Sequence, residues 1–284
     1  MGKKILVTGV PGNVGSAVVN NLIEYGCEVR AAVYNIERAR GEVDSNVQLV
    51  RLDFEDPTTY EPALEGINKI FLMRPPAISD MKKYMFPFID KAKEMGVEHV
   101  VFLSLLGIEK NPIPPHYKVE KYLEKSGIDY TFLRPSFFMQ NLSTTHRDDI
   151  KTEGNIFIPA GNAKVSFIDA RDIGEVGAIT LANKGHENKA YTLTGPEAIT
   201  YYDVADIFTK ELGRKVRYTN PNPLKFRNTM IRKGTPKAFA NVMVGLYLTT
   251  RFGMAKLVTP QMEKILGRKP ISVKQFIQDH IECW

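Results

Sequence analysis

Three glycines near the start of the chain have the spacing of a diphosphate-binding turn. Gly9, Gly12 and Gly15 follow the apolar run 5–7 and open a segment whose apolar residues recur at helical spacing. Gly9 would let the chain turn sharply off a strand, Gly12 would let the backbone approach a pyrophosphate, and Gly15 would let the helix pack closely. Amide groups at a helix N-terminus favour bound phosphate because they carry partial positive charge. The spacing therefore predicts a dinucleotide site.

The residues after the second predicted strand indicate which dinucleotide is preferred. Sites selective for NAD usually end this strand with an acidic residue that binds the ribose hydroxyls. Residues 31–35 contain no carboxylate, and Arg30, Arg38 and Arg40 are nearby. A carboxylate would repel the 2′-phosphate of NADP, whereas a guanidinium would bind it. We therefore expect NADP(H) to be preferred, with Arg38 at the 2′-phosphate and NAD(H) as a possible cofactor. The alternative is that Arg38 and Arg40 lie on a solvated helix face.

Further cofactor contacts are expected where the third and fourth strands end. Asp53 is a candidate acceptor for the adenine amino group, or else it caps a helix that begins near Pro57. Arg74, Pro75 and Pro76 would border the nicotinamide ribose, where Arg74 meets phosphate, an acidic substrate or only solvent. The full set of predicted cofactor contacts is Thr8, Gly9, Gly12, Asn13, Val14, Gly15, Tyr34, Arg38, Asp53, Phe54, Met73, Arg74, Pro75 and Pro135.

The elements that must position these residues alternate between strand and helix. Apolar or β-rich runs at 4–7, 28–34, 47–52, 69–73, 97–103 and 130–133 are separated by helical patterns near 14–25, 58–64, 80–95 and 116–125. Apolar strands separated by crossover helices are typical of a parallel sheet covered on both faces. We therefore predict an α/β fold with a doubly wound parallel sheet of Rossmann type, together with a smaller, mostly helical C-terminal lobe.

The rhythm changes after Pro135, which suggests a second region. We assign residues 1–150 to an NAD(P)-binding Rossmann domain and residues 151–284 to a mixed region. In that region, about 165–195 would return to the sheet and about 200–284 would form a lobe that caps the substrate. Ligands of doubly wound folds bind at the carboxyl edge of the sheet, so the lobe is expected over that edge.

Composition excludes several classes of protein. The chain has 284 residues with 38 Lys and Arg against 32 Asp and Glu, a modest formal charge of +6. Cys27 and Cys283 suggest no disulfide framework, and five scattered histidines suggest no metal site. No apolar run is long enough to cross a bilayer. We therefore expect a cytoplasmic protein that binds neither nucleic acid nor membrane.

Motifs along nearly the whole chain carry a family resemblance. They are LDFED at 52–56, VFLS at 101–104, SGIDYTFLRP at 126–135, FIDARDI at 167–173, LTGP at 193–196 and LGRKP at 266–270. With the glycine turn, they make the sequence similar to the NmrA-like atypical short-chain dehydrogenase/reductases. That group includes type 2 quinone oxidoreductases, azo-dye and triphenylmethane reductases, and redox-sensing transcriptional regulators.

The sequence contains a Tyr-x-x-x-Lys string of the kind that most short-chain dehydrogenases use as a proton-transfer pair. It spans Tyr117 and Lys121. Helical spacing puts Val119, Tyr122 and Leu123 on the buried face of this segment, so the pair would project into solvent on the opposite side. We interpret the string as a chance match.

The resemblance points to other catalytic candidates. His116 falls where relatives carry a functional lysine or histidine, and Ser104 matches the family's serine. The family's usual tyrosine falls at Pro112, which cannot transfer a proton. A histidine with an ordinary pKa would suit proton donation near neutrality, but His116 would otherwise be a helix-start residue. Ser104 would either hold a substrate oxygen or bond local backbone.

These features favour a reductase. Hydride transfer to an electron-poor quinone, azo compound or related dye needs alignment more than acid catalysis, and we expect no metal or flavin. Phe137, Phe138 and Met139 would form the apolar wall for such a small-molecule acceptor. The alternative is a non-catalytic NAD(P)-binding redox sensor that acts on a regulatory protein partner. A third possibility, a nucleotide-sugar epimerase, is disfavoured by Pro112.

Overall fold

The computed structural model describes residues 4–284, in which seven parallel strands form one sheet. The strands are β1 (Lys4–Val7), β2 (Glu28–Val33), β3 (Gln48–Arg51), β4 (Lys69–Met73), β5 (His99–Leu103), β6 (Asp129–Pro135) and β10 (Lys189–Leu193). Their spatial order is β10-β6-β5-β4-β1-β2-β3, and every neighbouring pair is parallel. The order reverses between β1 and β4, which is where doubly wound sheets bind ligands. The predicted Rossmann-type sheet is confirmed.

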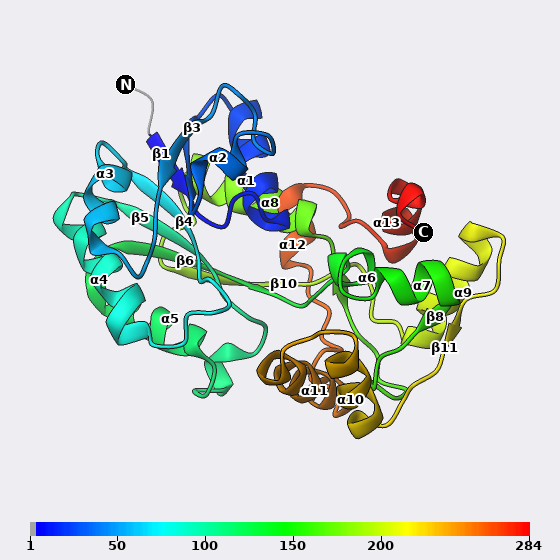
Figure 1. Cartoon of the computed structure of the whole chain (residues 1–284). Helices are drawn as coiled ribbons and strands as arrows, with labels where there is room; N and C mark the ends of the chain where they lie inside the picture. The colour runs from blue at the N-terminus through cyan, green and yellow to red at the C-terminus, as the bar shows by residue number, and fades with distance from the viewer. Residues whose placement is uncertain (1–3) are drawn as a thin grey trace. The chain divides into compact units, whose positions relative to one another are not determined.

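Helices cover both faces of this sheet (Figure 1). On one face α1 (Asn13–Glu24) packs against α8 (Ala170–Ala182). On the other face lie α3 (Tyr60–Leu64), α4 (Met81–Glu94) and α5 (Pro115–Ser126). Because both faces are covered, nearly all residues of β1, β4 and β5 are buried, whichever face they point to.

Side-chain alternation along β4 shows how one strand serves both faces. Ile70 and Leu72 pack with α3, α4 and α5 in a core of buried apolar residues. Phe71 points the other way, where its ring would lie 3.0 Å from a Cβ added to Gly177 of α8. A Cβ on Gly174 would come within 2.3 Å of the Ala17 Cβ. Small residues thus allow α8 to lie close to α1, far away in sequence.

The chain divides into two compact units. The first comprises residues 1–135, 170–193 and 261–267, and the second comprises residues 136–169, 194–260 and 268–284. The first unit also contains α2 (Ile36–Ala39), α12 (Gln261–Leu266) and the short 3-10 turns Pro57–Thr59 and Ile108–Lys110.

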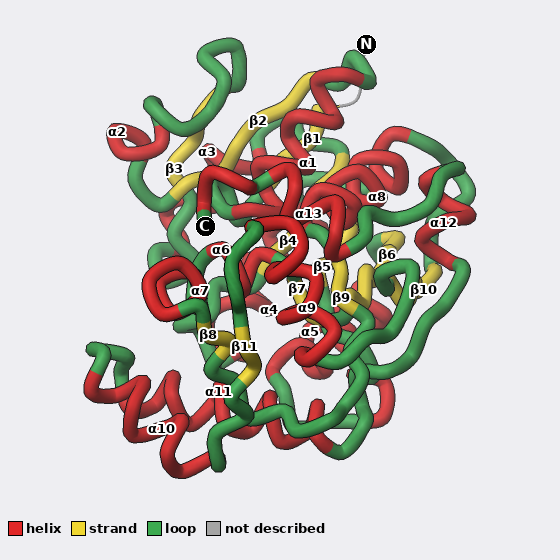
Figure 2. Tube along the Cα trace, turned by 90° about the vertical axis from the view of Figure 1, so that its right-hand side faces the viewer, coloured by secondary structure: helices red, strands yellow, loops and turns green. Residues whose placement is uncertain are grey.

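Helices make up most of the ordered structure of the second unit (Figure 2). They are α6 (Gln140–Ser143), α7 (Arg147–Glu153), α9 (Tyr201–Leu212), α10 (Pro223–Arg232), α11 (Lys237–Arg251) and α13 (Val273–Asp279), followed by the 3-10 turn Ile281–Cys283. Two strand pairs join them: β7 (Phe137–Phe138) with β9 (Phe167–Ile168), and β8 (Asn155–Ile156) with β11 (Arg217–Tyr218). This unit has its own apolar core, in which Phe208, Phe226 and Phe276 are fully buried.

Candidate cofactor site

The glycine turn after β1 is built around a close approach of the backbone to itself. Gly9 has a φ of +78°, a left-handed conformation that favours glycine. The Gly12 amide donates to the Gly9 carbonyl at 2.9 Å. A Cβ on Gly15 would lie 2.4 Å from that same carbonyl oxygen, and one on Gly12 would lie 2.8 Å from it. Gly12 and Gly15 are therefore required first by the packing of the turn against the start of α1.

The start of α1 offers free backbone donors. Gly12 is the N-cap and has no side chain to accept from the first amides of the helix, and the first turn holds no acidic residue. The amides of Asn13, Val14 and Gly15 belong to the set that has no carbonyl partner inside a helix. A helix end of this kind binds phosphate.

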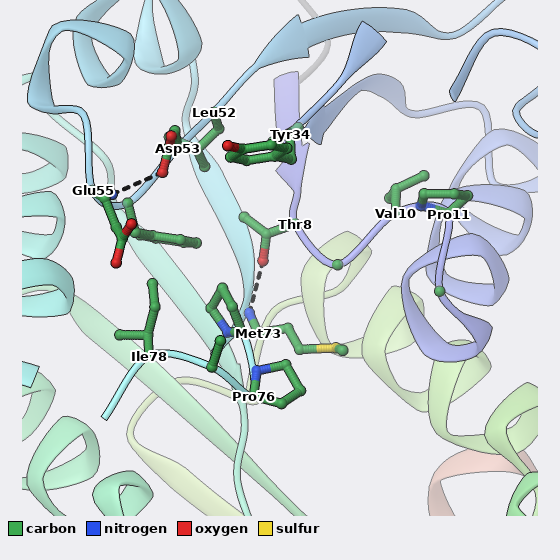
Figure 3. A pocket seen from close by; sticks show the side chains of 16 residues that line it. Thr8, Val10, Pro11, Tyr34, Leu52, Asp53, Glu55, Met73, Pro76 and Ile78 are labelled. Atoms are coloured by element: carbon green, nitrogen blue, oxygen red, sulfur yellow. Dashed lines mark hydrogen bonds between the residues drawn. The ribbon is translucent and has the colours of Figure 1, made fainter. Parts of the chain in front are cut away.

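A cavity of about 440 Å³ lies beside this turn, at the carboxyl ends of β1, β2, β3 and β4 (Figure 3). It is lined by Thr8, Gly9, Val10, Pro11, Gly12, Ala32, Tyr34, Leu52, Asp53, Phe54, Glu55, Met73, Pro75, Pro76, Ala77 and Ile78. The predicted contacts Thr8, Gly9, Gly12, Tyr34, Asp53, Phe54, Met73 and Pro75 are among these residues. The others, namely Asn13, Val14, Gly15, Arg38, Arg74 and Pro135, lie outside this lining.

Thr8 ties the end of β1 to β4 at the cavity wall. Its hydroxyl donates to the Phe71 carbonyl at 3.1 Å and accepts from the Met73 amide at 2.7 Å. The Thr8 amide donates to the same carbonyl at 3.0 Å. The side chain is buried, so its role in this structure is to hold the two strand ends together beside the glycine turn.

Tyr34 and Asp53 face the cavity from the ends of β2 and β3 (Figure 3). The Tyr34 side chain is largely exposed, whereas one Asp53 oxygen accepts from the Glu55 amide at 2.9 Å. The helix-capping alternative for Asp53 is wrong, because Asp56 caps the turn that starts at Pro57 by accepting from the Thr58 amide. Asp53 is thus available as an acceptor at the cavity wall.

The three arginines near the second strand have different surroundings. The Arg38 side chain is 84% exposed and lies 4.0 Å from Glu42, and Arg40 pairs with Glu37. Arg30 is buried, and its guanidinium donates to carbonyl groups at the end of α3. Arg30 therefore has no part in binding a phosphate at the cavity. The exposed side chain of Arg38 is free to bind one.

Arg74 organises the loop that forms one wall of the cavity. Its guanidinium donates to the carbonyls of Pro75, at 2.8 Å, and Pro76, at 3.1 Å, and to that of Ile78. Burial lowers the pKa of Arg74. Three expected roles were phosphate, acidic substrate or solvent contact; the structure shows a fourth, in which the side chain holds residues 75–78 in place. The sequence analysis missed Ala77 and Ile78 because a loop after a strand has no periodic pattern.

Ser104 belongs to a buried charged cluster at the carboxyl ends of β5 and β6. Its hydroxyl donates to Glu120 Oε1 at 2.5 Å, and Glu120 is almost fully buried on α5. Arg134 binds both oxygens of this carboxylate, at 3.0 and 2.7 Å, and lies 3.2 Å from Glu109. Burial opposes the charge on Arg134, and Glu120 more than compensates, so the pKa of Arg134 is raised. Ser104 therefore bonds a carboxylate, not local backbone.

His116 lies at the start of α5, with its ring 5.9 Å from the ring of Phe102. Burial, and then the positive charge of Arg74, lower the pKa of His116 to about 3. Its Nδ1 and the Nε of Arg74 are both buried without a hydrogen-bond partner among residues 4–284. This pKa is well below the near-neutral value expected for His116, so the imidazole is uncharged at pH 7. It is suited to donate a hydrogen bond and not to release a proton.

The Tyr-x-x-x-Lys string does not form a buried pair. Lys121 is exposed and pairs with Glu124 at 2.8 Å, while Tyr117 is half-buried. The predicted buried face of α5 is partly wrong. Glu120 is buried with Val119 and Leu123, whereas Tyr122 is half-buried.

The three predicted acceptor-binding residues lie in the second unit. Met139 is fully buried in its apolar core, and its amide donates to the Ile168 carbonyl at 2.8 Å. Phe137 and Phe138 form β7 and are half-buried, with the Phe137 ring 6.2 Å from that of Tyr247. Their role toward an acceptor stays a prediction.

Residues 4–284 hold no group of three His, Cys, Asp or Glu arranged to bind a metal ion. They also hold no helix with the length and apolar character that crossing a bilayer requires.

The comparison with protein families decides the assignment. Residues 1–276 match the model described as the NmrA-like family. The chain belongs to the NmrA-like family. The resemblance inferred from the sequence motifs is confirmed, and the match spans both units of the structure.

Individual relatives agree with this assignment. The NAD(P)H azoreductase of Xenophilus azovorans is 33% identical over 282 residues, which are 97% of this chain and 97% of that protein. The uncharacterized oxidoreductase YesF of Bacillus subtilis is 32% identical over 284 residues, 99% of this chain and 96% of that protein. The crystal structure of the NADPH-dependent quinone oxidoreductase QOR2 of Escherichia coli, complexed with NADPH, superposes with a TM-score of 0.88. It is 24% identical and covers 98% of this chain and 99% of that one, a likeness of fold.

Proposed function

We propose that this NmrA-like protein is an NAD(P)H-dependent reductase that transfers hydride to a small conjugated acceptor, such as a quinone or an azo dye, and that it prefers NADPH. The observation that carries the proposal is the cavity beside the glycine turn, at the strand ends where the order of the sheet reverses. The full-length similarity to an NAD(P)H azoreductase supports the choice of reaction class.

The residues around the cavity fit a dinucleotide. The uncapped amides at the start of α1 would hold the pyrophosphate, and the glycines leave room for it to approach the backbone. Asp53 would accept from adenine, and Tyr34 offers an aromatic face beside it. Arg38 would bind the 2′-phosphate of NADPH, because it is exposed and the neighbouring end of β2 has no carboxylate.

The acceptor side of the reaction requires little acid catalysis. A bound nicotinamide would supply the hydride. Pro112 stands where the family's tyrosine is expected, so the chain lacks the customary proton-transfer pair. A neutral His116 would orient the acceptor through an N–H hydrogen bond, and water would deliver the proton. An electron-poor quinone or azo compound tolerates this arrangement because it accepts hydride without prior protonation.

The test is oxidation of NADPH by the full chain in the presence of a panel of quinones and azo dyes. We expect steady loss of the NADPH absorbance with at least one acceptor, and weaker activity with NADH. Cofactor binding that is tight but gives no turnover with any acceptor would contradict the proposal. If a regulatory protein is also recovered with the chain only when the cofactor is bound, the redox-sensor alternative would be favoured instead.

A further inference from the structure

The basic charge of the protein is concentrated in one segment of the second unit. Residues 212–262 contain ten Lys and Arg and no Asp or Glu, whereas the whole chain has a formal charge of only +6. The rest of the chain is therefore net acidic. Helices α10 and α11 form the middle of this segment and lie side by side (Figures 1 and 2), joined by a hydrogen bond from Arg227 to Asn241 at 2.6 Å.

Most of these cations have no carboxylate to neutralise them. Lys233 pairs with Asp149 and lies 3.8 Å from Glu153. No carboxylate of residues 4–284 forms an ion pair with the following side chains of α10, α11 and the segment after α11: Lys225, Arg227, Arg232, Lys237, Arg251 and Lys256. Unpaired cations gathered in one place create a positive potential that attracts an anionic surface.

Apolar side chains protrude among these cations. On α11, Phe239, Val242 and Leu246 are spaced at i, i+3 and i+7 and are exposed, Val242 by 64%. The segment after the helix adds Phe252, at 81%, and Met254, at 63%, followed by exposed Leu257 and Val258. Large side chains exposed together, in contrast to scattered ones, mark interaction sites.

The core of the second unit does not need this apolar stripe. The adjoining side of α11 contributes Ala240, Met243 and Tyr247, which are buried in the apolar core. The helix is therefore apolar on two adjoining sides, only one of which packs inside the protein. Basic residues together with exposed Phe and Leu are typical of helices that lie in the interface of a bilayer, whereas Lys is depleted at protein interfaces.

We propose that the exposed side chains of α10, α11 and residues 252–258, here called the basic apolar surface, bind the surface of an anionic lipid membrane. Lys and Arg would contact lipid phosphates while the apolar side chains enter the headgroup region. A second copy of the chain is a poor occupant, because two surfaces without acidic residues repel each other. The proposal replaces the sequence-based expectation that no membrane is a partner, and it does not depend on the reductase activity.

The test is sedimentation of the full chain with vesicles of phosphatidylcholine alone and of an equal mixture with phosphatidylglycerol. We expect binding to the anionic vesicles only, weakened by salt. The variants Phe252→Ser with Met254→Ser, and Lys237→Glu with Lys256→Glu, should each bind roughly tenfold more weakly. Matched controls in the first unit are Ile23→Ser and the pair Lys82→Glu with Lys184→Glu, which should bind like the wild type.

Circular dichroism melting and NADPH binding confirm that each variant is folded. Failure of the wild type to sediment with anionic vesicles would overturn the proposal, as would equal losses in the control variants. Binding that survives both changes to the basic apolar surface would also overturn it. If the same variants instead abolish binding to an acidic polypeptide, to nucleic acid or to a second copy, while vesicles are ignored, that occupant replaces the membrane.

Discussion

The hydroxyl of Ser104 points at Glu120 and donates its only hydrogen to that carboxylate, at 2.5 Å. The oxygen of Ser104 can therefore only accept a hydrogen bond from any further partner. A ligand would have to approach Ser104 with an N–H or O–H group, and a carbonyl oxygen would find no donor there. The role of holding a substrate oxygen, inferred from the family's serine, thus requires that Glu120 first release the hydroxyl.

The first prediction concerns the charge cluster around Glu120. We expect Glu120→Gln to lower the free energy of unfolding by about 3 kcal/mol, because Arg134 then loses a buried partner. Urea unfolding measures the change. Glu124→Gln on the same helix is the control and should cost less than about 1 kcal/mol, since its pair with Lys121 is on the surface. Equal losses in the two variants would show that the cluster is not special.

The second prediction concerns the glycine turn. Gly15→Ala puts a Cβ 2.4 Å from the Gly9 carbonyl oxygen, so the turn must move away from α1. We expect NADPH affinity to fall at least ~tenfold, along with a loss of about 1–3 kcal/mol in stability from overpacking. Fluorescence titration and thermal unfolding report the two effects. Gly41→Ala, whose added Cβ meets no atom within 4 Å, should leave both unchanged.

The third prediction tests cofactor selectivity. Arg38→Ala should weaken NADPH binding about tenfold, the loss of one charge-assisted hydrogen bond, and should leave NADH affinity unaltered. Arg40→Ala is the matched control, because that side chain pairs with Glu37. If NADPH affinity is the same in wild type and Arg38→Ala, Arg38 does not contact the 2′-phosphate.

The fourth prediction follows from the neutral state of His116. Its pKa of about 3 means that it does not titrate between pH 5 and 8. We expect His116→Gln, which keeps an N–H donor, to retain the shape of the wild-type profile of kcat against pH with only a modest loss of rate. A limb near pH 6.5 in the wild type that disappears in His116→Gln would show that the histidine titrates in the working enzyme.

The fifth prediction concerns acid stability. Burial, and then the charge of Lys69, lower the pKa of His99 to about 4, from an ordinary value of 6.5. The Thr131 hydroxyl donates its hydrogen to the His186 carbonyl, so His99 Nε2 must donate to the Thr131 oxygen. His99 Nδ1 is buried without a hydrogen-bond partner among residues 4–284. Between pH 6.5 and 4, His99 binds a proton in the unfolded chain but not in the folded protein. The free energy of unfolding therefore decreases as the pH falls through this range.

The size of that effect can be measured. At pH 5 the buried neutral His99 lowers the free energy of unfolding by about 2 kcal/mol, since each pKa unit is worth about 1.4 kcal/mol. Urea unfolding at pH 7 and pH 5 should therefore show a drop that is about 2 kcal/mol smaller in His99→Gln than in wild type. His280→Gln is the control, because that half-buried ring lies near the chain end. Parallel curves for wild type and His99→Gln would refute the assignment.

The strands and glycine turn were predictable because their signals are local. Residues 5–7 and 70–73 are apolar throughout, and Gly9, Gly12 and Gly15 follow a strand and open a helix. A parallel sheet covered on both faces leaves this pattern in the sequence itself. Family motifs then extended the prediction to the later segments.

Buried charges gave no such signal. Glu120 is an acidic residue in a helix, which periodicity assigns to the surface. Ser104, just after β5, and Arg134, on β6, nevertheless enclose it. Arg30 is one of three basic residues near the end of the second strand, but carbonyl groups more than thirty residues away satisfy its guanidinium. Partners that are distant in the chain decide the burial of such residues, so a single sequence does not reveal them.

The two hydrogen bonds of the Thr8 hydroxyl, one donated to the Phe71 carbonyl and one accepted from the Met73 amide, have a kinetic consequence. β1 lies between β2 and β4 in the interior of the sheet, so the end of this strand opens only when the sheet itself does. Its amide hydrogens should exchange with solvent slowly even before any nucleotide arrives. A turn held firmly in one shape would bind a dinucleotide without rearrangement, so encounter by diffusion would limit how fast the dinucleotide is captured.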